Sequence, residues 1–153
     1  MRTIEQLNAL LATPEGRREI NEWAEEFVFG HIRCDGWVRG DFGIAKTCDH
    51  DQGKCFPANG RTMFQLDYTT DPAAAEQVRQ RAAKHPLFGV WADNVWALAA
   101  NRGVRRGPME VVLQYGQPSD YVGAFWLLDA DEELKQQCTT PPNSNATSDK
   151  PNV

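Results

Sequence analysis

The chain has 153 residues, of which 41% are hydrophobic and 24% charged, and this balance indicates a soluble protein of one domain. Its net charge of −5 argues against a general affinity for nucleic acid or for an anionic membrane, because both require a basic surface. The sequence contains neither a signal-peptide pattern nor an apolar run of the ~18 residues that a membrane span needs. We therefore expect a cytoplasmic protein without a membrane segment, in which the four cysteines are thiols or metal ligands rather than disulfides.

The first thirty residues predict two helices. Thr3 and Gln6 have the spacing of a capping box, and Pro14 is suited to the first turn of a second helix. Apolar side chains then recur at helical spacing and predict a face directed toward the core: Ile20, Trp23, Ala24, Phe27 and Val28. We expect Gly30 to end this second helix.

The middle of the chain predicts strands and helices in turn. Alternating apolar residues favour a strand that begins at Trp37 and a second strand over 61–68. Asp71 and the proline after it are typical of a helix start, and this helix should run to about Lys84. Another helix is expected between Leu87 and Asn101, because apolar residues recur there at helical spacing.

The last third predicts a β-hairpin and a tail. Met109–Tyr115 and Tyr121–Leu128 are rich in strand-forming residues and are separated by five residues of loop-forming composition. A short helix is expected over 129–137, and residues 139–153 are too polar to fold, so they should form a disordered tail. The prediction is an α+β domain over 1–138, with two N-terminal helices, two middle helices and a small antiparallel sheet of about four strands.

Three of the four cysteines lie between His31 and Cys55. Cys34, Cys48, His50 and Cys55 are the candidate ligands of a zinc ion, because zinc prefers four thiolate and imidazole donors. The spacing, however, lacks the two close ligand pairs of a zinc knuckle. We therefore expect no cofactor and favour unligated thiols with surface histidines, and keep zinc as the alternative.

A second group of candidate residues could bind an acidic partner. Arg102, Arg105 and Arg106 lie in a loop flanked by glycines, and arginine binds carboxylates and phosphates through two hydrogen bonds at once. Trp96 and Trp37 lie outside the apolar helical patterns and are therefore candidates for an exposed binding surface. The simpler interpretation of the arginines is a solvated loop.

Three functions are consistent with these patterns. The first is a protein-interaction module, an adaptor or inhibitor without enzymatic activity that docks on a larger macromolecule, most simply a protein. The second is a small binding module stabilised by zinc in the His31–Cys55 region. The third is a thiol-dependent enzyme in which one of these cysteines is activated by His31, His50 or His85. His85 also precedes a proline at a helix end, where a protonated imidazole would interact favourably with the helix dipole.

Overall fold

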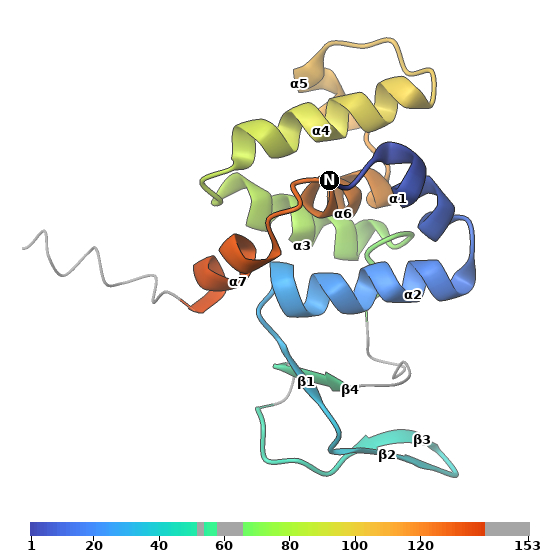
Figure 1. The fold of residues 1–153 in the computed structure, drawn as a ribbon. Coiled ribbons are helices and arrows are strands. Elements are labelled where there is room, and N and C mark those ends of the chain that lie inside the picture. The colour runs from blue at the N-terminus through green and yellow to red at the C-terminus, as the bar shows by residue number, and fades with distance from the viewer. Residues whose placement is uncertain (52–53, 58–65, 140–153) are drawn as a thin grey trace, which may run out of the picture.

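The protein has two parts in the computed structural model, which describes residues 1–51, 54–57 and 66–139 (Figure 1). The helical body consists of residues 1–29 and 66–139, and the β-lobe consists of the described residues of 31–57. The β-lobe extends from the side of the helical body formed by the second helix (Figure 1). The fold is thus a mixture of helix and sheet, as expected from the sequence.

The two predicted N-terminal helices are present. α1 (Ile4–Leu11) begins with the capping box, in which the backbone N–H of Gln6 donates to the Thr3 hydroxyl and the Gln6 side chain accepts from the Thr3 N–H. α2 (Pro14–Trp23) continues directly into the π-helical turn η1 (Ala24–Val28). Together α2 and η1 place their apolar face on the core.

The core of the helical body is built around α6 (Pro118–Trp126), which packs against α3 (Pro72–Ala83) and α4 (Phe88–Asn101). All residues of α6 from Asp120 to Trp126 are buried. Trp91 of α4 is fully buried, and its indole N–H donates to the carbonyl of Tyr121 over 2.9 Å. The predicted starts of α3 at the N-cap Asp71 and of α4 after Leu87 are confirmed.

The predicted hairpin between residues 109 and 128 is wrong. Its first strand is the short helix α5 (Pro108–Glu110) followed by the π-helical turn η2 (Val111–Tyr115), and its second strand is α6. A run that is apolar on every side is typical of a buried helix as well as of a central strand, so the pattern alone could not distinguish them. The apparent loop before α6 contains its N-cap, because Gln117 and Asp120 form a capping box there.

The four-stranded antiparallel sheet is also wrong, because the β-lobe contains two separate pairs of short strands. β1 (Ile32–Cys34) pairs in parallel with β4 (Cys55–Pro57), and β2 (Trp37–Gly40) pairs antiparallel with β3 (Gly43–Lys46). The single strand predicted from Trp37 is in fact this hairpin. Gly43 has a φ of +114°, a conformation that favours glycine, and it lets the chain reverse here.

The remaining predictions concern residues 61–68 and the C-terminal part of the chain, which are only partly among the described residues. The predicted strand over 61–68 falls mostly outside the described residues, and residues 66–68 are not in a strand. The short C-terminal helix is confirmed as α7 (Asp131–Thr139). Of the predicted tail, Thr139 belongs to α7 and residues 140–153 lie outside the described residues. Within the part of the chain that the structure describes, no helix is long and apolar enough to cross a membrane.

Candidate metal centre

The parallel pairing of β1 and β4 positions the first and last cysteines of the candidate site. Ile32 lies opposite Cys55 and Cys34 lies opposite Pro57. Side chains alternate between the two faces of a strand, so Cys34 and Cys55 share one face of the strand pair. Two cysteines that are separated by twenty residues in the sequence therefore become neighbours.

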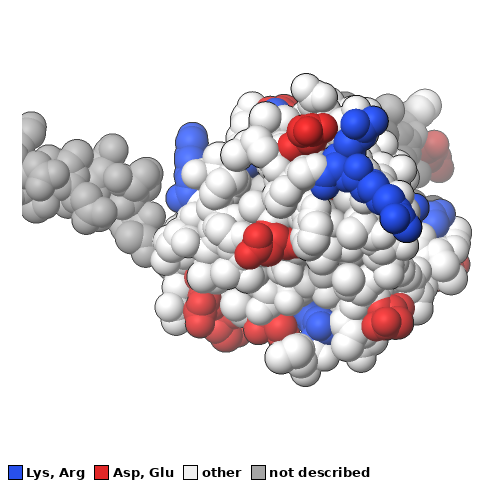
Figure 2. All heavy atoms as spheres, turned by 90° about the horizontal axis from the view of Figure 1, so that it is seen from above, with Lys and Arg blue, Asp and Glu red and all other residues white. Residues whose placement is uncertain are grey.

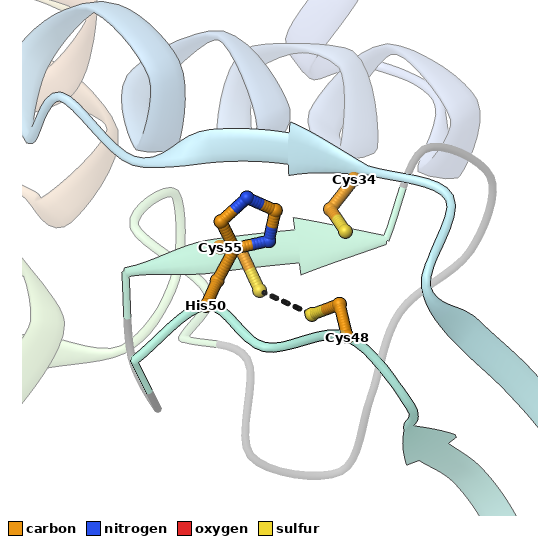
Figure 3. A group of neighbouring side chains, drawn as sticks. All are labelled: Cys34, Cys48, His50 and Cys55. Atoms are coloured by element: carbon orange, nitrogen blue, oxygen red, sulfur yellow. Dashed lines mark hydrogen bonds between the residues drawn. The ribbon is translucent and has the colours of Figure 1, made fainter.

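The other two candidate ligands come from the segment after β3. Cys48 and His50 follow this strand, and their side chains converge with those of Cys34 and Cys55 on one point (Figure 3). One donor atom of each residue lies within 4.8 Å of all the others. Ligands of a tetrahedral zinc ion at about 2.3 Å would have their sulfur atoms about 3.8 Å apart, so only small side-chain movements are needed. The group can therefore hold a metal ion.

Backbone contacts keep the segment of Cys48 close to that of Cys34. The N–H of Gly36 donates to the Cys34 sulfur over 3.2 Å, and the carbonyl of Gly36 accepts from the N–H of Thr47 over 2.6 Å. A Cβ atom at Gly36 would lie only 2.4 Å from the Cβ of Cys48, so this approach requires glycine. The ammonium group of Lys46 donates to the backbone carbonyl of Cys48 over 2.7 Å, which holds the segment after β3 in place.

The thiols of Cys48 and Cys55 influence each other. Their sulfur atoms are 3.5 Å apart (Figure 3). Burial opposes ionisation of Cys48, but hydrogen bonds with His50 and the neighbouring thiols outweigh it and lower the pKa of Cys48 to about 6. Burial raises the pKa of Cys55, and its neighbour Cys48 raises it further. A divalent cation bound by these sulfur atoms would displace the protons that the thiols carry.

The Trp37 side chain lies beside the same cluster. Its indole nitrogen is buried and forms no regular hydrogen bond with the described residues. The indole acts to lower the pKa of Cys55, against the larger effect of burial. An N–H group next to a thiolate is the kind of outer contact that stabilises metal-bound sulfur. The predicted binding residue Trp37 is thus part of the surroundings of the metal ligands.

His31 and Cys138 lie outside the cluster. The imidazole of His31 pairs through Nδ1 with the carboxylate of Glu25, at the junction between η1 and β1. The Cys138 sulfur accepts from the guanidinium of Arg81 over 3.0 Å and donates to the carbonyl of Val28 over 3.3 Å. Of the five histidines and cysteines from His31 to Cys55, the structure therefore brings together the four that the sequence singled out.

His85 differs from the sequence expectation. Its Nδ1 atom accepts a hydrogen bond from the backbone N–H of Leu87 over 3.0 Å. Burial lowers the pKa of His85, and the nearby guanidinium of Arg81 lowers it further. The lowered pKa favours the neutral imidazole at this end of α3, and its Nδ1 lone pair is already used.

The three candidate arginines have different environments. Arg102 is exposed, but its guanidinium forms an ion pair with the buried carboxylate of Asp120 and is therefore already engaged within the helical body. The guanidinium of Arg106 lies 5.1 Å from the ring centre of Tyr115, and the carbonyl of the same residue accepts from the Trp96 indole over 3.1 Å. Arg105 is exposed. Only Arg105, Arg106 and Trp96 therefore remain as surface candidates.

Sequence patterns missed several residues, both at the candidate metal site and on the surface that includes Trp96. Gly36 and Lys46 hold the metal-site segment together, but neither has a recognisable motif around it. The sequence also assigned Met109 and Tyr115 to a strand, whereas they lie in α5 and η2 and are exposed, with exposed fractions of 69% and 40%. Pro108 could have indicated the start of a helix here, because proline is typical of a first helical turn.

No protein-family model matches the chain, and neither a curated protein nor a solved structure shows significant similarity to it. The function therefore has to be inferred from the residues themselves.

Proposed function

We propose that the protein is a non-enzymatic binding module whose β-lobe is stabilised by one zinc ion, bound by Cys34, Cys48, His50 and Cys55. The observation that carries this proposal is the convergence of four donor atoms within 4.8 Å of one another. These are the four residues that the sequence indicated, although their spacing argued against a zinc knuckle. The spacing argument loses its force because β1 and β4 pair in parallel and bring distant ligands together.

The donor set favours zinc over the other common metals. Three sulfur atoms and one imidazole suit zinc, whereas calcium and magnesium prefer oxygen. Four protein ligands complete a tetrahedral site and leave no position for water or substrate, which is typical of a structural rather than a catalytic zinc. A zinc ion together with three thiolates would have a net charge of about −1, and Lys46 contributes a positive charge at the backbone carbonyl of the ligand Cys48.

The β-lobe needs such a stabilising element. Its strands have three or four residues each and form two pairs, and isolated two-stranded pairs are marginally stable in water. Phe56 is buried, but Ile32 and Val38 are half exposed and Phe42 is fully exposed at the hairpin turn. A metal ion that joins both strand pairs would supply the missing folding free energy and would fix the position of the exposed hairpin.

Metal analysis of the purified protein tests this proposal. We expect one zinc per chain, loss of zinc in Cys55→Ser, and unchanged zinc content in the matched control Cys138→Ser. Cobalt(II) in place of zinc should give the visible spectrum of a tetrahedral thiolate site. Hydrogen exchange should show that a chelator exposes the amides of the β-lobe while the core of the helical body stays protected. Zinc content that is zero in the wild type, or equal in both variants, would overturn the proposal.

A second candidate function is docking of an acidic partner on the surface around Trp96. This surface, which we call the α4–α5 face, consists of Trp96, Arg105, Arg106, Met109 and Tyr115. The view onto α4 and α5 shows basic side chains gathered at one side of a mostly uncharged surface (Figure 2). Arginine and tryptophan are enriched at the energetic centres of interfaces, and an acidic segment complements this charge.

Replacing both Arg105 and Arg106 with alanine tests the second candidate. Once a partner has been identified, the double variant should bind it at least about 30-fold more weakly, and the loss should shrink at high salt because the charges are screened. Arg18→Ala removes an exposed arginine of α2 and is the matched control. Equal affinities of the wild type and the double variant would show that the α4–α5 face is only solvated surface.

A further inference from the structure

The cluster of donor atoms contains two thiols that are close enough to react with each other. The sulfur atoms of Cys48 and Cys55 are 3.5 Å apart (Figure 3). A disulfide bond has a length of about 2.05 Å, so the two atoms would have to approach by about 1.5 Å. Cys48 lies in the segment after β3, and Cys55 is the first residue of β4. No large movement of the strands is needed for this approach.

The two thiols differ in their access to solvent. Cys48 is partly exposed, whereas Cys55 is only 6% exposed. An oxidant in solution would therefore reach the Cys48 sulfur first. Cys34 is also buried, and its sulfur accepts the hydrogen bond from the N–H of Gly36. This arrangement gives one accessible thiol with a protected thiol beside it, which is the usual arrangement of a thiol pair that senses oxidants.

We propose that this metal site is also an oxidation site, at which peroxide converts Cys48 and Cys55 into a disulfide and releases the zinc ion. The inference rests on the proposed zinc site and adds its regulation. Cys34 and His50 would remain as ligands, and two ligands do not hold a zinc ion in a structural site. Oxidation would thus remove the ion that stabilises the β-lobe, and reduction would restore the ligand set.

The chemistry balances with one molecule of hydrogen peroxide. The Cys48 thiolate attacks one peroxide oxygen, the O–O bond breaks, and the products are a sulfenic acid at Cys48 and hydroxide, which takes up a proton to become water. The Cys55 thiolate then attacks the Cys48 sulfur, the S–O bond breaks, and the departing hydroxide is protonated to a second water. Two thiolates lose two electrons, and the peroxide gains them.

Each of the four cysteines lies on a different tryptic peptide, which makes the product easy to identify. Trypsin cleaves after Arg33, Lys46 and Lys54, so Cys34, Cys48 and Cys55 are separated from one another, and cleavage after Lys135 isolates Cys138. Peptides 47–54 and 55–61 can then be joined only through a Cys48–Cys55 disulfide. Mass spectrometry of a digest without reductant therefore reports the pairing directly.

The experiment treats the zinc-loaded full chain with hydrogen peroxide. We expect one zinc per chain to appear on a chromogenic chelator, in parallel with the linked peptides 47–54 and 55–61, and we expect dithiothreitol to reverse both. Cys138→Ser should behave like the wild type. In Cys55→Ser the second thiol is missing, so the sulfenic acid at Cys48 should persist and be trapped by dimedone, whether or not this variant holds zinc.

The outcomes separate the two proposals. If the purified protein holds no zinc but peroxide still links Cys48 to Cys55, the thiol pair is real and the zinc proposal fails. If the protein holds zinc and releases none under peroxide, or if the linked peptides contain Cys34 or Cys138 instead, the oxidation proposal fails and the zinc site stands. Absence of the linked peptides after treatment of the metal-free chain would also overturn the oxidation proposal.

Discussion

The phenolic hydroxyl of Tyr68 donates a hydrogen bond to the carboxylate of Glu25 over 2.8 Å, in the interior of the protein. Glu25 is only 6% exposed, and its second carboxylate oxygen pairs with His31. Burial and the charge of Glu25 raise the pKa of Tyr68 well above its ordinary value, so the hydroxyl remains a donor. These contacts connect the helical body with the residue that precedes β1, and thus fix where the β-lobe begins.

Removal of the Tyr68 hydroxyl should destabilise the protein. Tyr68→Phe keeps the ring, which stacks on Phe29 with 5.0 Å between ring centres, but leaves one oxygen of a buried carboxylate unpaired. We expect a loss of about 1.5–3 kcal/mol in the free energy of unfolding, measured by urea denaturation. Tyr115→Phe is the matched control, because Tyr115 is 40% exposed, and it should change stability by less than about 0.5 kcal/mol. Equal losses of stability in the two variants would mean that the hydrogen bond from Tyr68 to Glu25 does not stabilise the protein.

Arg102 and Arg105 should differ in their effect on stability. Arg102→Ala leaves the carboxylate of Asp120, which is 3% exposed, without its charged partner. Burial already raises the pKa of Asp120, while the N–H of Gln117 and the guanidinium of Arg102 hold it down. We expect a cost of about 2–4 kcal/mol for Arg102→Ala, and almost none for Arg105→Ala. Thermal denaturation of both variants would measure this, and two equal melting temperatures would contradict it.

Asp67 should make folding stability depend on pH in the acid range. Burial alone would raise its pKa, but hydrogen bonds from Thr69, Asn21 and Thr70 outweigh burial and lower the pKa of Asp67 to about 2, from 3.8. A lowered pKa in the folded state stabilises the protein fully above pH 3.8, and this contribution is lost as the pH falls from there through 2. Because the group is partly exposed, we expect about 1–2 kcal/mol.

The Asp67 contribution can be measured with one variant. In Asp67→Asn the free energy of unfolding should be lower than in the wild type at pH 5, and the difference should shrink as the pH approaches 2. Exposed Asp49 offers a matched control, since Asp49→Asn should change the free energy of unfolding at pH 5 by less than about 0.5 kcal/mol. A difference between Asp67→Asn and the wild type that stays constant as the pH falls would argue against the lowered pKa.

Two tryptophans provide a test of the core. Trp23 is 8% exposed and lies 5.5 Å from the guanidinium of Arg2 and 6.1 Å from the ring of Phe27. Trp23→Ala should cost about 3–5 kcal/mol. Trp96 is 42% exposed, and its replacement by alanine should cost about 1 kcal/mol. Chemical denaturation of the two variants checks that Trp23→Ala loses more stability than Trp96→Ala. A near-neutral Trp23→Ala would mean that the apolar face of α2 does not form part of the core.

Elements whose signals are local could be predicted from the sequence. The capping box at Thr3, the first-turn proline after Thr13 and the N-cap Asp71 predicted three helix starts. The side chains of Thr3 and Asp71 accept from free backbone N–H groups of the first turn, and the proline removes one such group. The sequence also named the four metal-ligand candidates, because thiol and imidazole groups are recognisable as donors without any geometry. The buried position of Trp91 followed from helical spacing in the same way.

Features that depend on neighbours distant in the chain could not be predicted from the sequence. Tyr121–Leu128 is rich in strand-forming residues, yet it is mostly helix α6, since contacts with α3 and α4 on all sides outweigh intrinsic preferences of less than about 1 kcal/mol per residue. Arg102 was indistinguishable from Arg105 until its partner Asp120 was in place. Cys34 and Cys55 became neighbours through the parallel pairing of β1 with β4, and no spacing rule along a sequence encodes the register of two strands.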